Sequence, residues 1–529
     1  MDETLASAFQ FVGQDLPQLL EHWVAKHPVK PLLVWEPKDG SDRTWTYAEF
    51  VTSTKEIAVG LAAKGVTKGD KVLIHSDNCP EMVLAWYACA QLGAVGVTTN
   101  TRSVAAEMNY FITHTDCVGA ITQPQYASLV SEAADLGWVV VTEDNSGLPA
   151  TDDELNHGFD SFASLHGDAA TFTPRTPEPM LPVGILFTSG TTSRPKAVVH
   201  THANALWASR MGPNTIDFRN DDKYLIYLPF FHVNAQSWSL WTVLGAGGTV
   251  VLQPKYSASR FWGVIAKHSI THISLIPFVF KAIQHDPIPE HTVRVGVFGL
   301  IMPILSDWLG MRVVAAYGMT ETVIHATRDS ALQGTPDMSM GRPTPGYEFI
   351  VVNQDTGEIC EQSEIGELWV RGTPGIQLFL EYYDNADAMA KSFTDDGWFK
   401  TGDLVRWEDG GNFFYCERDS DALKVGGENV STREVEDVCR IVPGIDDIAV
   451  VGQSHEMLDM VPVAFVIKGA GAEEDDAAFG QAIIDACAAN LADFKVPRAV
   501  YVVDEFPRAT LDKVAKNALR EMADERLSA

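Results

Sequence analysis

The most informative stretch of this chain runs from residue 186 to residue 197 and reads Leu186-Phe187-Thr188-Ser189-Gly190-Thr191-Thr192-Ser193-Arg194-Pro195-Lys196-Ala197. It follows an apolar run, Val183–Phe187, whose composition predicts a buried strand. From Thr188 to Lys196 the chain places five Ser/Thr hydroxyls, one glycine and one lysine within nine residues. Hydroxyls, exposed backbone N–H groups and an ammonium are the groups with which a loop wraps a polyphosphate.

The same loop taken alone allows a simpler interpretation. Its spacing is not that of a Walker-type loop, which needs Gly-x4-Gly-Lys-Ser/Thr. A Ser/Thr-rich segment is also typical of a polar surface turn. The rest of the chain must decide between the two interpretations.

Size and charge exclude some classes of protein. At 529 residues the chain exceeds what one hydrophobic core usually supports, so at least two domains are expected. A composition of 46% hydrophobic and 21% charged residues is typical of a globular protein. The net charge of −31, from 39 basic and 70 acidic residues, argues against a nucleic acid as the main partner.

Cysteine usage and hydropathy indicate the compartment. Seven cysteines are scattered singly with no Cys-x-x-Cys pair, which favours a reducing cytoplasm over a disulfide framework or a zinc site. The segment Met1–Thr4 is acidic and lacks the apolar core of a signal peptide. No apolar stretch reaches the length that spans a membrane. We therefore expect a soluble cytoplasmic protein, monomeric or homodimeric.

The predicted secondary structure changes in type twice along the chain. Up to about Gly341, predicted helices at 46–65 and 80–93 alternate with short apolar strands, which is typical of parallel α/β layers. These strands are expected at residues 71–74, 94–97, 183–187, 224–228, 249–252, 270–276 and 313–316. The next section suggests an antiparallel β segment, with strands at 348–352 and 367–371.

The final section predicts a compact α+β unit. Its expected elements are strands at 448–451, 463–467 and 499–503 and a helix at 478–491. The fold class is therefore α/β, with a large N-terminal domain of layered subdomains plus a β segment. We place the domains at 1–416 and 417–529, the second being a small α+β domain.

Four further motifs follow the loop in order. Tyr317-Gly318-Met319-Thr320-Glu321-Thr322 follows a predicted strand, where open α/β sheets bind ligands, and Glu321 is a hard carboxylate able to hold Mg²⁺. Asp403 follows a glycine turn and suits a ribose diol. Arg418 belongs to a charged junction before Gly426-Gly427, and Lys513 lies close to the C-terminus.

Each motif taken singly has a simpler explanation. Glu321 could be a helix N-terminal acid, Asp403 a turn cap and Arg418 half of a surface ion pair. Lys513 could be a solvated charge, and Gly426-Gly427 a hairpin turn. Their joint occurrence in one order has no comparable simple explanation.

With these motifs, the chain resembles the acyl-activating adenylate-forming superfamily, which includes acyl-CoA synthetases, peptide-synthetase adenylation domains and beetle luciferases. The similarity extends from about Leu16 to Leu519. Met319 and the pair Phe231-His232 resemble the CoA ligases more than the amino-acid-activating domains. The segment Gly427–Ser431 is similar to crotonobetaine/carnitine-CoA ligases.

The resemblance implies a role for each motif. The loop would fold over the β- and γ-phosphates of ATP, using Thr188, Ser189, Gly190, Thr191, Thr192 and Lys196. Thr188 and Glu321 would carry Mg²⁺. The nucleotide and the acyl carboxylate would lie along Tyr317, Gly318, Met319 and Thr320. Asp403 and Arg418 would hold the ribose, and Lys513 would bridge the carboxylate and the α-phosphate.

The resemblance also implies two half-reactions at one site. The C-terminal domain would rotate, so that the segment with Lys424, Gly426 and Gly427 replaces Lys513 and the thiol of coenzyme A attacks. His232 would gate the passage between the acyl site and the CoA tunnel; the alternative is a core histidine. His200 and His202 are expected to be structural.

The chain departs from the family pattern at several positions. Ser193 and Ala197 stand where glycine is usual, and losing glycine restricts the backbone. Ser420 replaces the usual Asp or Lys of the hinge, and Asp512 places a carboxylate next to Lys513. The segment 298–312 is shorter than usual, which leaves the identity of the acid open.

The hypothesis is an ATP-dependent carboxylate–CoA ligase that uses Mg²⁺ and coenzyme A and makes acyl-CoA, AMP and pyrophosphate through an acyl-adenylate. Its partners would be a small carboxylic acid, ATP and CoA. Two alternatives stay open: an adenylating enzyme that loads a carrier protein, and a catalytically degenerate nucleotide-binding protein.

Overall fold

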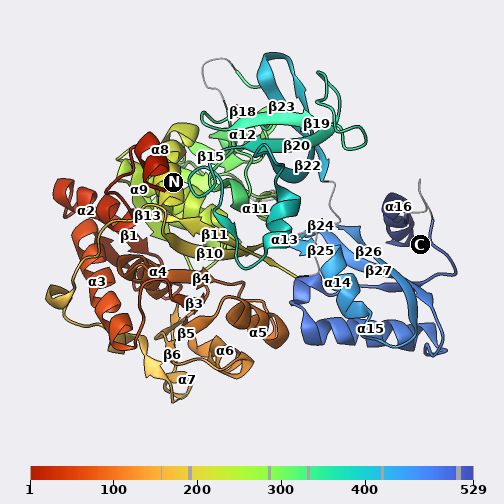
Figure 1. Ribbon diagram of the computed structural model, residues 1–529, viewed down its shortest axis with the longest axis horizontal. Helices are drawn as coiled ribbons and strands as arrows, with labels where there is room; N and C mark the ends of the chain where they lie inside the picture. Colours follow the sequence, from red (N-terminus) through yellow and green to blue (C-terminus); the bar gives the residue numbers. More distant parts are fainter. Residues whose placement is uncertain are drawn as a thin grey trace.

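Figure 1 shows the computed structural model of the protein, which describes residues 2–155, 158–188, 194–283, 287–329, 334–418, 422–507 and 514–527. Within these ranges, no helix combines the length and apolarity needed to cross a membrane. Two large sheets with flanking helices build most of the chain up to residue 329, and the parallel α/β layers expected there are confirmed.

The first large sheet has the strand order β16-β15-β14-β12-β13-β1-β2. Its strands are β1 (Pro31–Trp35), β2 (Arg43–Thr46), β12 (Lys223–Ile226), β13 (Thr249–Leu252), β14 (His272–Ser274), β15 (Val295–Phe298) and β16 (Arg312–Ala315). All neighbours pair in parallel except β1 and β2. The chain therefore leaves β12 and β16 at the same edge, where His232 and Tyr317 follow.

The second large sheet has the order β21-β11-β10-β4-β3-β5-β6-β9. Its strands are β3 (Lys71–His75), β4 (Val95–Thr98), β5 (Cys117–Thr122), β6 (Val139–Val141), β9 (Asp160–Ser161), β10 (Pro182–Thr188), β11 (Lys196–Thr201) and β21 (Glu381–Tyr382). The strand expected before the Thr/Ser loop is thus present as β10. It pairs in parallel with β4 and antiparallel with β11.

Helices cover these sheets, and the two that the sequence predicts here, at 46–65 and 80–93, are present as α3 and α4. The main ones are α2 (Leu16–Lys26), α3 (Tyr47–Ala63), α4 (Pro80–Leu92), α5 (Ala105–His114), α6 (Ala127–Ala133), α8 (His202–Ile216), α10 (Ala258–His268), α11 (Pro277–Ile283) and α12 (Pro303–Leu309). At α3 the capping box is complete: Thr46 Oγ1 accepts from the Glu49 N–H at 3.2 Å, and Glu49 Oε2 accepts from the Thr46 N–H at 2.8 Å.

A smaller antiparallel sheet, at the top of Figure 1, confirms the expected β segment. Its strands are β19 (Glu348–Val352), β20 (Gly366–Arg371), β22 (Phe399–Glu408) and β23 (Asn412–Arg418). The boundary that we expected between residues 416 and 417 falls inside β23. The chain therefore changes sheets only after Arg418, because β23 continues its pairing with β22 up to that residue.

The C-terminal unit, residues 422–507 and 514–527, has its own five-stranded sheet, drawn in blue in Figure 1. The strands are β24 (Ala422–Val425), β25 (Glu428–Ser431), β26 (Ile445–His455), β27 (Asp459–Lys468) and β28 (Val500–Val502); the helices are α14 (Thr432–Cys439), α15 (Asp476–Asn490), the 3-10 turn η7 (Asp493–Lys495) and α16 (Lys516–Leu527). Its apolar clusters, around Val450 and Phe465, contain no residue of the N-terminal unit. A separate core is what defines a domain.

Candidate functional site

The Thr/Ser loop is carried by the hairpin of β10 and β11. Thr188, the last residue of β10, lies opposite Lys196, the first residue of β11. The hydroxyl Oγ1 of Thr188 is buried, and no hydrogen-bond partner for it occurs among the described residues. Ser189, Gly190, Thr191, Thr192 and Ser193 lie outside the described residues. The hairpin thus positions both ends of the predicted loop.

Ala197, where glycine is usual, lies in β11 and not in the loop. It is 1% exposed, and its carbonyl accepts from the Tyr383 N–H at 2.8 Å. It pairs with Phe187 across the hairpin in ordinary strand register. Because a strand needs no positive φ, alanine is compatible with this position, and our concern about a stiffened loop does not apply to residue 197.

Tyr382 joins Lys196 to Glu321. The Nζ atom of Lys196 lies 4.5 Å from the centroid of the Tyr382 ring. The Tyr382 hydroxyl donates to Glu321 Oε1 at 2.9 Å. Both Tyr382 and Glu321 are buried, at 3% and 5% exposure. Two residues predicted for phosphate and metal binding are therefore held together by a third residue, which the sequence analysis missed.

The pairing of β21 with β11 explains this position of Tyr382. Val198 lies opposite Tyr382, so the tyrosine stands beside the Thr/Ser loop although it follows Lys196 by 186 positions in the sequence. The only sequence signal was a tyrosine pair, Tyr382-Tyr383, after an apolar run. Such a pair has no chemical meaning until the sheet order is known.

Tyr317 and Asp403, two predicted site residues, lie in contact. The Tyr317 hydroxyl donates to Asp403 Oδ2 at 2.5 Å, and Asp403 is 5% exposed. Tyr317 follows β16 and is anchored by its own N–H, which donates to Thr327 Oγ1 at 3.0 Å. Asp403 lies in β22 opposite Arg418 of β23 in backbone register. The side chain of Arg418 lies outside the described residues.

The segment Gly318–Glu321 lies against the wide helix η4 (Asn234–Trp241), a π-helix. A Cβ on Gly318 would lie 3.0 Å from Trp238 Cζ2 and 3.1 Å from the Ile324 carbonyl oxygen, so a larger residue here would crowd both. π-helical turns are frequent at functional sites. Gly318 therefore lies against the indole of Trp238, the carbonyl of Ile324 and the backbone of the buried residue His325.

The imidazole of His325 packs beside Trp238. Its ring centroid lies 4.8 Å from that of Trp238, and burial lowers the pKa of His325 to about 3. Within the described ranges, His325 Nε2 and Trp238 Nε1 have no hydrogen-bond partner. A neutral imidazole and an indole N–H therefore offer unused hydrogen-bonding capacity beside Gly318. Sequence analysis did not identify either of them as a site residue.

The histidines expected to be structural make structural contacts. His200 Nε2 donates to the Thr320 carbonyl at 2.8 Å, and burial lowers the pKa of His200 to about 4. His202 Nε2 accepts from Arg175 Nη2 at 2.9 Å. Met319 is held by its N–H, which donates to Thr322 Oγ1 at 3.0 Å. Two hydrogen bonds therefore hold the segment Tyr317–Glu321 in place: one from the Met319 N–H to the Thr322 hydroxyl and one from His200 to the Thr320 carbonyl.

At the other end of η4, His232 meets the C-terminal unit. Its Nε2 donates to Glu428 Oε2 at 3.0 Å, and Asn100 Nδ2 donates to the same oxygen at 3.2 Å. The His232 side chain is 38% exposed and that of Glu428 is 14% exposed. Burial disfavours the charged imidazole, but the Glu428 carboxylate outweighs it and raises the pKa of His232. Burial likewise opposes ionisation of Glu428, but His232 and more distant cations lower its pKa.

Glu428 is delivered by the turn Gly426-Gly427 between β24 and β25. Both glycines have positive φ, +60° and +94°, as a tight hairpin turn requires. A Cβ on Gly427 would lie 3.3 Å from Ile276 Cδ1 of the N-terminal unit. The structure therefore places the predicted turn next to His232. Lys424 of β24 has an exposed side chain.

Several predictions fall outside the described residues. Lys513 and its neighbour Asp512 belong to this group, as does Ser420. The described chain on either side of Lys513 is joined by a hydrogen bond, since the Ala515 N–H donates to the Pro507 carbonyl at 2.8 Å. The segment 298–312, which we described as shortened, contains only the two-turn helix α12.

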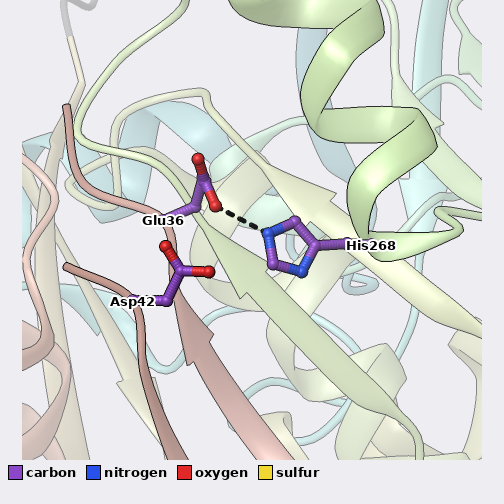
Figure 2. A group of neighbouring side chains, drawn as sticks. All are labelled: Glu36, Asp42 and His268. Carbon is purple, nitrogen blue, oxygen red and sulfur yellow. Dashed lines mark hydrogen bonds and ion pairs between the residues drawn. The ribbon is translucent and has the colours of Figure 1, made fainter. Parts of the chain in front are cut away.

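A group of potential metal ligands lies elsewhere, at Glu36, Asp42 and His268 (Figure 2). Glu36 Oε2 accepts from His268 Nε2 at 2.7 Å and from Lys267 Nζ at 2.6 Å, and Arg260 Nη2 reaches Oε1 at 2.6 Å. Burial raises the pKa of Glu36, but these hydrogen bonds outweigh burial and lower it. Two fixed cations already occupy the carboxylate, so this group is an ion-pair network that ties β1 to α10 and not a metal site.

Comparison with known proteins adds the family. The sequence profile of the AMP-binding enzyme family matches residues 20–383, and that of the AMP-binding enzyme C-terminal domain matches residues 434–513. The crotonobetaine/carnitine-CoA ligase of Salmonella agona is 31% identical over 528 residues, which cover 96% of this chain and 99% of the relative.

Two solved structures of o-succinylbenzoate CoA synthetase from Bacillus subtilis are also similar, each 26% identical over 96% of this chain. A double mutant bound to the product analogue OSB-NCoA gives a TM-score of 0.78 over 99% of its own chain. The complex with AMP gives 0.63 over 98% of its own chain.

Proposed function

The chain belongs to the AMP-binding enzyme family, and from this premise we propose that it is an ATP-dependent carboxylate–CoA ligase. It activates a carboxylic acid with ATP and transfers the acyl group to coenzyme A. The observation that supports this proposal most directly is the turn Gly426-Gly427, which brings Glu428 to His232 beside the helix that packs on Gly318. A nucleotide-binding protein without a second substrate has no need of that contact.

In the first half-reaction, a carboxylate oxygen attacks the α-phosphorus of ATP, the bond to the β-phosphate breaks, and pyrophosphate leaves. The Thr/Ser loop, with Ser189, Gly190, Thr191, Thr192 and Lys196, grips the departing phosphates. Asp403 and Arg418 hold the ribose, while Tyr317, Gly318, Met319 and Thr320 border the adenine and the carboxylate. Lys513 bridges the carboxylate and the α-phosphate. Charge stabilisation and in-line positioning supply the catalysis.

Thr188 and Glu321 fit a magnesium ion. The buried Thr188 hydroxyl has no partner among the described residues, and Glu321 adds a carboxylate that Tyr382 orients. Oxygen donors of this kind are those that Mg²⁺ prefers. When bound, the ion would neutralise charge on the phosphates. Tyr382, Lys196 and Glu321 themselves lie together at β11.

In the second half-reaction, the thiol sulfur of coenzyme A attacks the acyl carbon, the bond to the AMP oxygen breaks, and one proton is released. The C-terminal unit rotates so that Lys424, Gly426 and Gly427 replace Lys513, and His232 opens the passage for the thiol. Support comes from the higher TM-score with the product-analogue complex, 0.78 against 0.63 for the AMP complex of the same enzyme. One active site then serves two reactions by domain movement.

The test is AMP release with ATP, Mg²⁺, CoA and a panel of short, branched, aromatic and polycyclic acids. We expect one class of acid to give CoA-dependent AMP release and an acyl-CoA. Acyl transfer to a carrier-protein phosphopantetheine but not to free CoA would replace this proposal by carrier loading. ATP binding by calorimetry without acid-dependent pyrophosphate release would indicate a degenerate nucleotide-binding protein.

We further propose a cytoplasmic enzyme, monomeric or homodimeric. All seven cysteines are free, and Cys439 Sγ lies 3.4 Å from Cys487 Sγ without a bond between them. Two adjacent thiols stay reduced in a reducing compartment. Sedimentation of the purified protein would decide the oligomeric state.

A further inference from the structure

The N-terminal and C-terminal units are joined by a buried ion triad of Lys495, Glu107 and Glu434. Lys495 Nζ lies 2.5 Å from Glu107 Oε1 and 3.0 Å from Glu434 Oε1. The three side chains are 6–7% exposed. Lys495 is the last residue of η7, and Glu434 lies in the first turn of α14; both belong to the C-terminal unit. Glu107 lies in the first turn of α5 in the N-terminal unit.

The ammonium of Lys495 is firmly held. Burial disfavours it, but the carboxylates of Glu434 and Glu107 outweigh burial and raise the pKa of Lys495. Burial raises the pKa of Glu434; Lys495 opposes this effect and Glu107 adds to it. Removing one member of a buried ion pair leaves an uncompensated charge, which is far more costly than losing an exposed pair. The exposed pair Arg102–Asp493 at the same interface is worth little by comparison.

Each side keeps a partner when the units separate. Lys495 retains Glu434 within its own unit. Glu107 retains the Val104 N–H, which donates to its Oε2 at 3.1 Å and caps α5. Lys495 and Glu107 therefore each keep one bonding partner within their own unit. An ion pair of this kind can be made and broken repeatedly.

The triad is connected to the contact at His232. Lys495 binds Glu434 at the start of α14, and α14 directly follows β25, whose first residue is Glu428. The Ser431 hydroxyl at the end of β25 accepts from the Glu434 N–H at 3.3 Å. In Figure 1, α5 faces the edge of the C-terminal unit that carries β25 and α14. Anchoring Lys495 on Glu107 thus fixes the strand that presents Glu428 to His232.

We propose that Glu107 is a positioning residue for thioester formation, because its ion pair with Lys495 holds the C-terminal unit in the arrangement that keeps Glu428 on His232. This inference rests on the proposed function for its chemical consequence. Glu107 contacts no substrate in this proposal. It acts on the equilibrium between arrangements, so it affects the second half-reaction and not the first.

The test compares the same kind of substitution in the buried triad and in the exposed pair at the same interface. Glu107→Gln removes the charge across the interface but keeps an oxygen for the Val104 N–H. Asp493→Asn makes the same change in the exposed Arg102–Asp493 pair. Acid-dependent pyrophosphate exchange reports the first half-reaction, and acyl transfer from supplied acyl-AMP to CoA reports the second. We expect Glu107→Gln to slow acyl transfer about tenfold or more while exchange stays within about twofold.

Asp493→Asn should leave the ratio of the two rates unchanged, because its ion pair is exposed. Small-angle X-ray scattering of the ligand-free proteins gives a readout that needs no activity: Glu107→Gln should change the scattering profile, and Asp493→Asn should not. Equal loss of both half-reactions in a folded Glu107→Gln protein, or a scattering profile identical to the wild type, would overturn the inference. If the wild type activates no acid, the proposed function fails, whereas scattering still decides the role of Glu107.

Discussion

Individual residues acquire their chemistry here from partners that are remote in sequence. Tyr382 orients Glu321 through a 2.9 Å hydrogen bond and lies under the Lys196 ammonium. Asp403 accepts a hydrogen bond from the Tyr317 hydroxyl, and Glu428 accepts one from the His232 imidazole. In each case the motifs supplied at least one member of the pair but did not predict the contact, because a motif shows which groups are available and not which of them meet.

The His232–Glu428 pair predicts a pH dependence. Docking of Glu428 raises the pKa of His232, so the contact is fully stabilising below the ordinary pKa of histidine and is lost as the pH rises through the raised value. We expect the ratio of acyl-transfer rates, wild type over His232→Gln, to fall toward one as the pH rises above the ordinary histidine pKa of about 6.5.

Comparing two proteins at each pH cancels the ionisation of the CoA thiol, which rises equally for both. Supplied acyl-AMP removes any contribution of the first half-reaction. A ratio that stays constant as the pH rises above that value would show that the charge of His232 does not influence docking.

Among the elements, the hairpin of β24 and β25 carries the turn that we propose for the second half-reaction. Its turn uses two glycines with φ of +60° and +94°, values that a residue with a side chain adopts only under strain. The turn also approaches Ile276 of the other unit closely. The sequence Gly426-Gly427 predicted a hairpin turn. The structure adds that Gly427 faces the N-terminal unit, where a side chain would crowd Ile276.

Gly427→Ala should therefore impair docking. The new Cβ would lie 3.3 Å from Ile276 Cδ1 at a position with positive φ. We expect acyl transfer from supplied acyl-AMP to fall about tenfold, which corresponds to about 1.4 kcal/mol, with pyrophosphate exchange largely retained.

Gly411→Ala is the matched control. Gly411 has a φ of +73°, in the turn between β22 and β23, and no described atom lies within 4 Å of the position that an alanine Cβ would take there. It carries the same backbone strain away from the interface, at a cost of about 1 kcal/mol of stability. If both variants lose acyl transfer to the same extent, strain alone explains the effect and the contact with Ile276 has no role.

At the scale of the whole molecule, two units with separate cores meet through polar contacts. The interface includes the Glu107–Lys495–Glu434 triad, the pairs Arg102–Asp493 and Lys281–Asp459, and the contact of Glu428 with His232 and Asn100. No apolar cluster crosses it among the described residues. An interface of this composition suits units that separate and dock again.

Domain alternation predicts a split phenotype for Lys513→Ala. Loss of one preorganised cation costs roughly 3–4 kcal/mol of barrier, so acyl-AMP formation should fall by about two to three decades. Conversion of supplied acyl-AMP to the thioester should persist, because the other arrangement of the C-terminal unit performs it. The two half-reactions are measured separately as above.

Lys468→Ala provides the control for that variant. Lys468 pairs with Asp476 at the surface of the same unit, at 2.5 Å, and should affect neither half-reaction. Equal loss of both half-reactions in folded Lys513→Ala would contradict domain alternation.

The sequence by itself determined the family, the layered α/β fold and the type of reaction. Strand and helix positions followed from local periodicity, and phosphate, ribose and carboxylate chemistry followed from short motifs whose residues act within a few positions of one another. The length of α12 and the position of Ala197 in β11 are also features of local backbone structure, which depends mainly on the neighbouring residues in the sequence.

Only the tertiary structure decided which groups meet. His232 and Glu428 are 196 residues apart, and Glu107 and Lys495 are 388 apart. Such contacts depend on strand order and on how two units dock, and a charged residue in a linear sequence has many candidate partners. The motifs therefore indicated which groups are available, whereas the fold determined that Tyr382 meets Glu321, Glu428 meets His232 and Glu107 meets Lys495.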